Sequence, residues 1–292
     1  QITLNEQHWD ALSPDDQSSI QVIRNIKRWA LCSDRFVRGL LEWRKETSPP
    51  DWWNAETRSV RLWEDSIPVE KVISTIMTKA VKEDGVSGKH IECHTGCPVH
   101  SNLTFRSDLV NALPAGSISG KVKLVTEEPI LFLTLAHRAG KLPEGTYLVY
   151  DVGGGSFDCA LVAVEQEKGQ VVVTVYAAGG DPLLGGSDID RWLASALSLP
   201  DTVSARDIRI AKEQVCKDPA SIAPLPGGKR VAYTDVEAVL KENRVFEKTI
   251  PVMLEVYHHA KLLWKRPNGV PPLGDVIWQD ATGHIRTVWQ LH

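Results

Sequence analysis

Apolar residues in the first half of the chain predict two amphipathic helices and one short strand. From Ser13 to Cys32, and again from Pro68 to Ala80, they recur every three or four positions, which predicts two amphipathic helices. Ser13 has the side chain of a helix N-cap, and the proline and acids after it suit a first turn. Ser59 to Trp63 has the length and composition of a short strand.

From His90 the chain alternates between strands and helices. Short apolar runs at His90 to Thr95 and at Val122 to Thr126 predict strands. Each is followed by a helix, the first at Leu103 to Leu113 and the second after Pro129. Strands joined by right-handed helical crossovers give this alternation, so it predicts an α/β lobe.

In the second half, three apolar runs predict consecutive strands: Tyr147 to Asp151, Phe157 to Val164 and Val171 to Tyr176. The residues Glu167-Lys168-Gly169 predict a hairpin turn between the last two strands. Helices are expected to begin where an N-cap or capping-box residue precedes helical spacing, at Ser187, Ser204 and Thr234.

The sequence predicts one interruption of a helix and one boundary between two lobes. Pro251 lacks the N–H that a helix interior needs, so it is predicted to interrupt the long helical region after Thr234. Near residue 145 the alternating pattern gives way to the run of strands, which predicts two lobes, residues 1–145 and 146–292. A chain of 292 residues is long enough to form two cores.

Composition narrows the class of protein. Hydrophobic residues make up 42% and charged residues 24%, as in ordinary globular proteins, and the net charge is −4. The sequence contains no basic stripe, so a nucleic-acid partner is not expected. The longest strongly apolar run, residues 130–136, is far too short to span a bilayer, so a membrane partner is not expected either. The five cysteines are odd in number and irregularly spaced, which favours reduced thiols and a cytoplasmic location.

One segment combines the end of an apolar strand, two acids and three glycines: Asp151-Val152-Gly153-Gly154-Gly155-Ser156-Phe157-Asp158. Glycines let the main chain approach a ligand closely and adopt positive φ, and successive backbone amides can then point at one anion. Because a carboxylate repels phosphate, Asp151 suits a hydrated Mg²⁺ instead. The segment therefore favours the phosphates of a metal-bound nucleotide, and the alternative interpretation is a glycine-rich hairpin turn.

This segment resembles the second phosphate motif of the 70-kDa heat-shock (Hsp70) proteins, Asp-Leu-Gly-Gly-Gly-Thr-Phe-Asp, from which Val152 and Ser156 depart conservatively. Four further segments resemble Hsp70 segments in the family's order. They are Lys27-Arg28, then Cys97-Pro98-Val99 with Arg106 eight residues after the proline, then Glu128-Pro129, and last Asp181 to Asp190, which contains Gly185 and Gly186.

The resemblance implies an α/β fold of the actin-like ATPase type: two ribonuclease-H-like lobes, here incomplete at the N-terminus, with ATP or ADP and Mg²⁺ in the cleft between them. It implies that Lys27 orients the attacking water, that Glu128 lies near the metal, and that Asp151 holds the metal through water. The other implied roles are donation to the terminal phosphate by Ser156, phosphate binding by Gly153, Gly154, Gly155, Gly185 and Gly186, adenosine binding by Glu213 and Lys217, and coupling to a peptide-binding domain by Pro98 and Arg106.

Several of these residues also have a purely structural interpretation. Lys27 would be an exposed helical lysine, and Glu128 would be an N-cap acid. Gly185 and Gly186 would form a tight turn before a helix, and Pro98 and Arg106 would be a turn proline and a surface arginine.

The sequence departs from the Hsp70 pattern at both ends of the nucleotide site. No segment like the family's first phosphate motif, Asp-Leu-Gly-Thr-Thr, precedes Lys27, and Gln1 at the start suggests processing or an excerpt of a longer protein. Cys216 stands where the family has the lysine of Ala-x-Glu-x-x-Lys, and residues 280–284 lack the paired glycines and the arginine of the family's adenosine segment.

Two functions follow from this pattern. The first is an Hsp70-like ATP-binding domain of the chaperone ATPase type, an ATP hydrolase if it is active, with no peptide-binding domain in this chain and with nucleotide and co-chaperones or other proteins as partners. The second is a degenerate Hsp70-like protein-interaction module that does not hydrolyse ATP.

Overall fold

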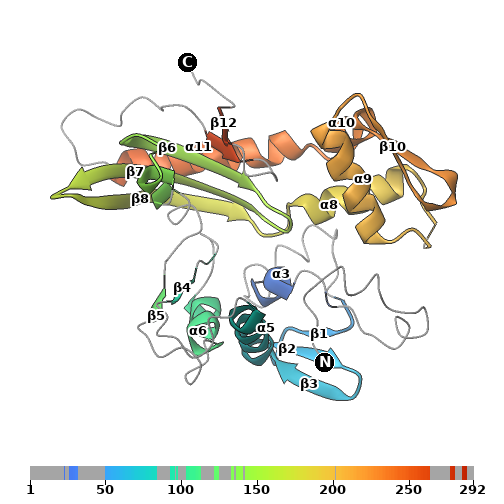
Figure 1. Ribbon diagram of the computed structural model, residues 1–292, viewed down its shortest axis with the longest axis horizontal. Coiled ribbons are helices and arrows are strands. Elements are labelled where there is room, and N and C mark those ends of the chain that lie inside the picture. The colour runs from blue at the N-terminus through green and yellow to red at the C-terminus, as the bar shows by residue number, and fades with distance from the viewer. Residues whose placement is uncertain are drawn as a thin grey trace. The chain divides into compact units, whose positions relative to one another are not determined.

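The computed structural model describes residues 23, 26–31, 50–83, 93–95, 97, 103–112, 122–124, 133–134, 136–140, 142–200, 202–263, 277–279 and 285–287. The chain divides into two compact units, residues 1–97 with 101–127 and residues 98–100 with 128–292 (Figure 1). The lobe limit near residue 145 stays a prediction. Among the described helices, none combines the length and the apolar character needed to cross a bilayer.

The first unit contains a small antiparallel meander followed by a long helix. Strands β1 (Trp53–Asn54), β2 (Ser59–Leu62) and β3 (Asp65–Pro68) form one sheet in that order. Helix α5 (Val69–Glu83) begins directly after β3. The strand predicted at Ser59 and the helix predicted after Pro68 are therefore confirmed. Of the helix predicted from Ser13, the structure describes α3 (Ile26–Leu31).

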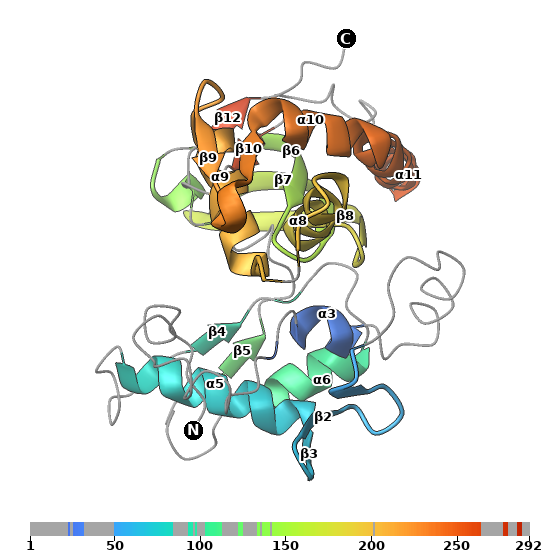
Figure 2. The ribbon, with the colours of Figure 1, turned by 90° about the vertical axis from the view of Figure 1, so that its right-hand side faces the viewer.

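The same unit contains the expected strand–helix–strand alternation. Strands β4 (Cys93–Thr95) and β5 (Val122–Leu124) pair in parallel, with helix α6 (Leu103–Ala112) between them in sequence. Helix α6 packs against α5 (Figure 2). Parallel strands need such a crossover, which confirms a mixed α/β structure here.

The second unit is built on a five-stranded sheet in the order β12-β11-β6-β7-β8. All neighbouring strands are antiparallel except β11 and β6, which pair in parallel. The strands are β6 (Gly145–Val152), β7 (Phe157–Glu167), β8 (Gln170–Asp181), β11 (Ile277–Gln279) and β12 (Ile285–Thr287). The three predicted strands are confirmed, and β8 continues five residues beyond the predicted end at Tyr176.

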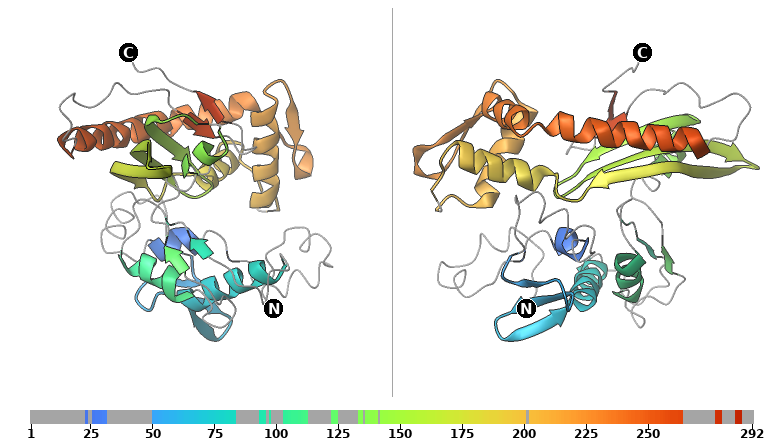
Figure 3. Two further views of the ribbon diagram at one scale, coloured as in Figure 1. Left: turned by 60° about the vertical axis from the view of Figure 1, so that its left-hand side comes forward. Right: turned by 180° about the vertical axis from the view of Figure 1, so that it is seen from behind.

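Alternating side chains of β6 and β7 fill a core on each face of this sheet. Leu148 and Leu161 pack on one face with Val256 and Ala260 of helix α11 (Val245–Leu263), which lies along the sheet (Figure 3). The other face is covered by Leu133, Ala136 and Leu142. Residues 133–134 and 136–138 are helical, as predicted after Pro129. A strand whose alternate residues face two cores reads as a continuous apolar run, which is why this part of the sequence was recognisable.

A helical group extends from the end of β8. It contains helices α8 (Gly186–Ala196), α9 (Ala205–Lys217) and α10 (Tyr233–Glu242) and the hairpin of β9 (Ile222–Pro224) and β10 (Arg230–Ala232), which share their own core (Figure 1). The predicted N-cap at Ser204 is confirmed, because its Oγ accepts a hydrogen bond from Asp207 N at 3.1 Å.

Two helix predictions in this unit are wrong by a short distance. Helix α8 begins one residue before Ser187, because loop carbonyls cap it from outside the segment. Helix α10 is capped at Ala232, whose N–H donates to Asp235 Oδ2 at 2.8 Å, and not at Thr234. The capping box therefore lies two residues earlier than predicted, and its carboxylate is Asp235 and not Glu237.

The prediction that Pro251 interrupts the last helical region is also wrong. Helix α11 runs through Pro251, and the region breaks instead before Val245, where Arg244 has a φ of 53°. Pro251 and Glu247, whose carbonyl loses its partner, both lie on the exposed side, where water can replace the bond. The opposite side is held by the sheet, because Gly179 of β8 lets Val256 and Val252 approach closely.

Candidate functional site

The glycine-rich segment forms the connection between β6 and β7. Val152 pairs with Phe157, so residues 153–156 make the loop, and Gly153 N donates to Ser156 O at 2.9 Å. The positive φ expected of the three glycines is not found, since none of them has φ in the left-handed range. A two-residue hairpin turn reverses the chain within residues that need positive φ. The connection here has four residues, so the chain can reverse direction without positive φ at the glycines.

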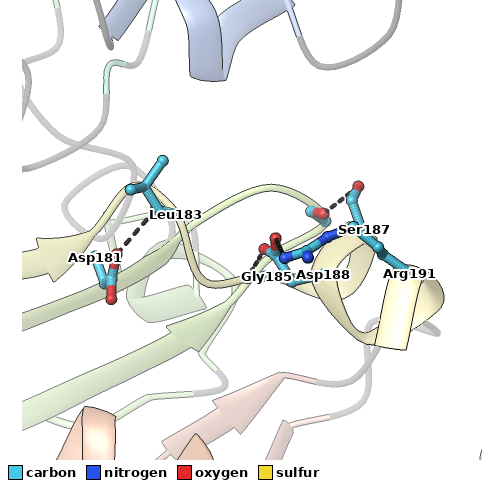
Figure 4. A network of polar contacts seen from close by, with 7 residues as sticks. Asp181, Leu183, Gly185, Ser187, Asp188 and Arg191 are labelled. Atoms are coloured by element: carbon cyan, nitrogen blue, oxygen red, sulfur yellow. Dashed lines mark hydrogen bonds and ion pairs between the residues drawn. The ribbon is translucent and has the colours of Figure 1, made fainter. Parts of the chain in front are cut away.

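The loop carbonyls cap the N-terminus of α8. Gly186 N donates to Gly153 O at 2.9 Å, and Ser187 N donates to Gly154 O at 2.8 Å. The Ser187 hydroxyl donates to the same Gly154 carbonyl at 2.8 Å (Figure 4). The first backbone N–H groups of a helix have no partner within it, so the hairpin supplies the partners that α8 lacks. The hairpin and α8 therefore form one hydrogen-bonded body.

Gly185 is where the two backbones come closest. A Cβ atom at this position would lie 2.6 Å from Gly155 C, 2.7 Å from Ser156 N and 2.8 Å from Gly155 N. The backbone of Gly185 is extended, with φ of −165°, so the need for glycine comes from space and not from a special conformation. Packing thus explains this glycine, and its implied role in phosphate binding stays a prediction.

Gly154 and Gly155 lie in the opposite situation. Within the described part of the chain, no heavy atom lies within 4 Å of the position that a Cβ would take at either residue. Neither residue has a left-handed φ. Nothing in the described fold therefore requires glycine at the tip of this hairpin.

Buried aspartates hold the segment that joins β8 to α8. Asp181 Oδ1 accepts a hydrogen bond from Leu183 N at 2.9 Å, and Asp188 Oδ2 accepts one from Gly185 N at 2.9 Å. Asp188 Oδ1 also lies 3.4 Å from Arg191 Nη2 (Figure 4). These contacts fix the approach of Gly185 to the hairpin, and a carboxylate in the first turn suits the helix dipole.

The two acids of the glycine segment face each other across the β6–β7 ladder. Asp151 pairs with Asp158 in register, and Asp151 is exposed while Asp158 is buried. The Ser156 hydroxyl donates to Asp158 Oδ2 at 2.9 Å. Because a hydroxyl has one proton to donate, donation from Ser156 to a phosphate requires this bond to break.

The donor set beside the loop suits a hard cation that also has other ligands. Opposed carboxylates on neighbouring strands repel each other, and a cation relieves that repulsion. Mg²⁺ is commonly bound by one or two carboxylates together with phosphates and water. Within the described residues, no group of three or more His, Cys, Asp or Glu side chains could hold a metal. Mg²⁺ at Asp151 would therefore take most of its ligands from a nucleotide and water.

An ion pair between α8 and α9 lies next to the hairpin. Lys212 Nζ lies 2.6 Å from Asp190 Oδ1 and donates to Gly186 O at 3.0 Å. Burial raises the pKa of the Asp190 carboxyl above its ordinary value, and the Lys212 ammonium offsets part of that rise. Sequence reasoning missed Lys212, although it immediately precedes the predicted site residue Glu213.

The residues implied for adenosine binding both belong to α9. Glu213 Oε1 lies 3.9 Å from Arg209 Nε, and Lys217 is exposed in the last turn. Cys216 stands in place of the family's lysine and is exposed as a residue. Its thiol is partly covered by neighbouring atoms, and this desolvation raises the pKa of the thiol. The adenosine role of these residues stays a prediction.

The remaining predicted site residues belong to the first unit or lie outside the described residues. Lys27 is in α3, although its side chain is not described, and Arg106 is half-buried in α6. Arg58 links these two helices, because Nη1 donates to the Ala30 carbonyl of α3 at 3.2 Å and Nη2 pairs with Asp108 of α6. Pro98 and Glu128 lie outside the described residues.

Comparison with known proteins finds a match for the part of the chain that contains the hairpin, α8 and most of α9. Residues 132–215 match the family model described as Hsp70 protein. This range includes Asp151, the glycine loop with Ser156, Gly185, Gly186 and Glu213, and it ends before Lys217.

Three curated proteins illustrate the similarity. The chaperone protein HscA homolog of Rickettsia rickettsii is 32% identical over 121 residues, which is 40% of this chain and 19% of that protein. The HscA homolog of Rickettsia prowazekii is 32% identical over 137 residues, 43% of this chain and 22% of that protein. The HscA homolog of Cupriavidus necator is 32% identical over 124 residues, 40% of this chain and 18% of that protein.

The aligned part of this chain thus spans about a fifth of the length of the curated relatives that it matches. The matched residues include the β6–β7 hairpin and α8, which the hydrogen bonds join into one body. The chain therefore resembles the nucleotide-binding domain of the Hsp70 chaperone family.

Proposed function

We propose that this chain is an Hsp70-like nucleotide-binding module with the two-lobed actin-like ATPase fold, which binds ATP or ADP with Mg²⁺ at the tip of the β6–β7 hairpin. The similarity to HscA chaperones supports the resemblance to the Hsp70 family. Nucleotide binding, ATP hydrolysis and any co-chaperone or client protein are proposed in addition. Its partners are a nucleotide first, and other proteins of a chaperone system second.

Gly154 and Gly155 carry this proposal. Gly185 is explained by its neighbours, but neither conformation nor packing within the described residues explains glycine at 154 and 155. A ligand that approaches the backbone from outside does explain it, because a side chain there would hold that ligand away. Backbone amides at a turn commonly bind phosphate, so a phosphate is the ligand that suits this tip best.

Each group around the tip would have a separate role in binding the nucleotide or its metal. The loop amides would donate to phosphate oxygens, and the exposed Asp151 carboxylate would hold water of the metal shell. Bound Mg²⁺ would neutralise phosphate charge, which is the main requirement of phosphoryl transfer. Lys27 would orient the attacking water and Glu128 would lie near the metal, as the family resemblance implies.

A second candidate function is a protein-interaction module that has lost hydrolysis. It is favoured by Cys216, which leaves the adenosine face of α9 without the family's lysine. It is also favoured by the Ser156 hydroxyl, whose proton is used by Asp158.

ATP turnover separates the two candidates. If the chain is an ATPase, we expect it to release phosphate from ATP in the presence of Mg²⁺. We expect Asp151→Asn to abolish that release, because the metal's water shell loses its carboxylate partner. Phosphate release is measured over hours at about 1 mM ATP, well above a micromolar Kd, with the Asp151→Asn chain as the control for contaminating ATPases. Binding of MgADP without any phosphate release from ATP would favour the second candidate.

A further inference from the structure

The turn between β2 and β3 presents a tryptophan to solvent (Figure 1). Leu62 pairs with Asp65 in register, so Trp63 and Glu64 form a two-residue loop. Trp63 is 70% exposed, the highest value among the exposed large apolar side chains of the described residues. An indole ring is large and apolar, so tryptophan usually has most of its surface buried. The meander therefore leaves mostly uncovered a side chain that folding normally covers.

The backbone at Trp63 is also unfavourable for a bulky side chain. Its φ is 51°, in the left-handed range, and Glu64 has no positive φ. A two-residue hairpin loop with positive φ at its first residue normally has glycine there. For a bulky residue such a φ is an outlier, because Cβ crowds the following carbonyl oxygen. The local fold would therefore be better served by glycine at this position.

Exposure and backbone strain are separate observations, and both lack an explanation within the described fold. Strained residues persist where the surrounding structure or a function requires them. Tryptophan is also among the residues that contribute most to the binding energy of protein–protein interfaces. A partner that covers the indole ring would supply the burial that the meander does not provide.

The charges around the turn indicate the chemistry of that partner. Residues 51–70 contain five acids and two arginines, and one of the arginines, Arg58, is paired with a carboxylate of α6. Glu64 and Asp65 are both exposed next to Trp63. The face of an indole ring attracts cations. The turn therefore combines an aromatic face and two carboxylates, and all three favour a positively charged partner.

We infer that the β2–β3 turn is a docking site for a basic segment of a partner protein. The Trp63 indole stacks on an arginine or lysine side chain of that segment, and Glu64 and Asp65 attract its neighbouring cations. An anionic membrane surface fits less well, because it would repel the same carboxylates. The turn belongs to the first unit, and the inference does not rest on nucleotide binding at the β6–β7 hairpin.

Three substitutions of Trp63 separate a docking role from a structural one. Trp63→Gly removes the ring and relieves the strain, whereas Trp63→Ala removes the ring and keeps a Cβ at the left-handed φ. Trp63→Phe keeps an aromatic face. Because the fold does not need the ring, we expect Trp63→Gly to have a higher urea unfolding midpoint than both the original chain and Trp63→Ala.

The binding probe is a short synthetic peptide of alternating arginine and glycine residues. Its affinity is measured by fluorescence anisotropy of a dye-labelled copy, with the full chain as titrant. We expect saturable binding with a Kd below about 1 mM, and at least about tenfold weaker binding to Trp63→Gly and to Trp63→Ala. We expect Trp63→Phe to lose less affinity than either, and a peptide with neutral citrulline in place of arginine not to bind.

Nuclear magnetic resonance of the indole N–H groups locates the contact. The Trp63 signal is the one absent from the spectrum of Trp63→Gly, and we expect the arginine peptide to shift that signal in the original chain. Absence of peptide binding, or equal affinity of the original chain and Trp63→Gly, would overturn the inference.

Two other results would also overturn it. A Trp63→Gly chain that is less stable than the original would show that the fold itself requires the ring. Binding to vesicles of phosphatidylcholine and phosphatidylserine, without binding to the peptide, would assign the turn to a membrane surface instead.

Discussion

Gly185→Ala is expected to destabilise the second unit by about 3 kcal/mol, because the added methyl group meets backbone and not a movable side chain. Its Cβ would lie 2.6–2.8 Å from atoms of Gly155 and Ser156, so the hairpin and α8 would have to separate. Separation would also weaken the bonds that Gly153 and Gly154 accept from the start of α8.

Gly154→Ala is the matched control for this prediction, since it makes the same chemical change on the other side of the contact, in the hairpin loop. The loop there has open space within the described part of the chain and no left-handed φ, so alanine fits. We expect it to leave the free energy of unfolding unchanged or to raise it by up to about 1 kcal/mol. Urea unfolding, followed by hydrogen exchange of residues 145–196, compares the two variants. Equal unfolding midpoints for Gly185→Ala and Gly154→Ala would contradict the packing described here.

Gly154→Ala and Gly155→Ala are expected to weaken MgADP binding by at least about tenfold, a loss of about 1.4 kcal/mol, without loss of stability. The physical reason is the reverse of that for Gly185. The space beside these two residues is open in the described part of the chain, and the proposal places the phosphates in it. A methyl group there would push a phosphate away from the loop amides.

Calorimetric titration with MgADP measures this effect, and Ser195→Ala is a suitable control. Ser195 is exposed near the C-terminal end of α8, so its substitution adds no atom near the hairpin, and the affinity of this variant should equal that of the original chain. Unchanged affinity in both Gly154→Ala and Gly155→Ala would show that the nucleotide does not approach the tip of the hairpin.

Local patterns allowed much of the second unit to be predicted from sequence. Apolar runs identified β6 and β7, and an N-cap hydroxyl identified the start of α9 at Ser204. Pro251 was misjudged because its cost depends on surroundings: the exposed side of α11 tolerates the missing bond while the opposite side packs on the sheet. Tertiary packing outweighs a local helix-breaking signal in such cases.

In the candidate site, features within one stretch of sequence were predicted, whereas contacts between residues far apart in the chain were not. The glycine segment and its acids were visible in one stretch of sequence, and the structure places them in one hairpin. The reason for Gly185 was not visible, because it depends on the backbone of Gly155, thirty residues earlier in the chain. The pair of Lys212 with Asp190 was missed for the same reason, since two separate helices form it.

Calorimetric titration of the chain with ADP, in the presence of Mg²⁺ and again with the metal chelated, tests the central claim most directly. We predict saturable binding of one ADP with a Kd on the order of micromolar, about −8 kcal/mol, and a marked loss of affinity when Mg²⁺ is removed or when Asp151 is changed to Asn. We also predict a rise in thermal stability with ADP concentration, because a ligand of the folded state stabilises that state. No heat of binding and no thermal stabilisation at about 1 mM ADP with Mg²⁺, far above a micromolar Kd, would contradict the proposed function.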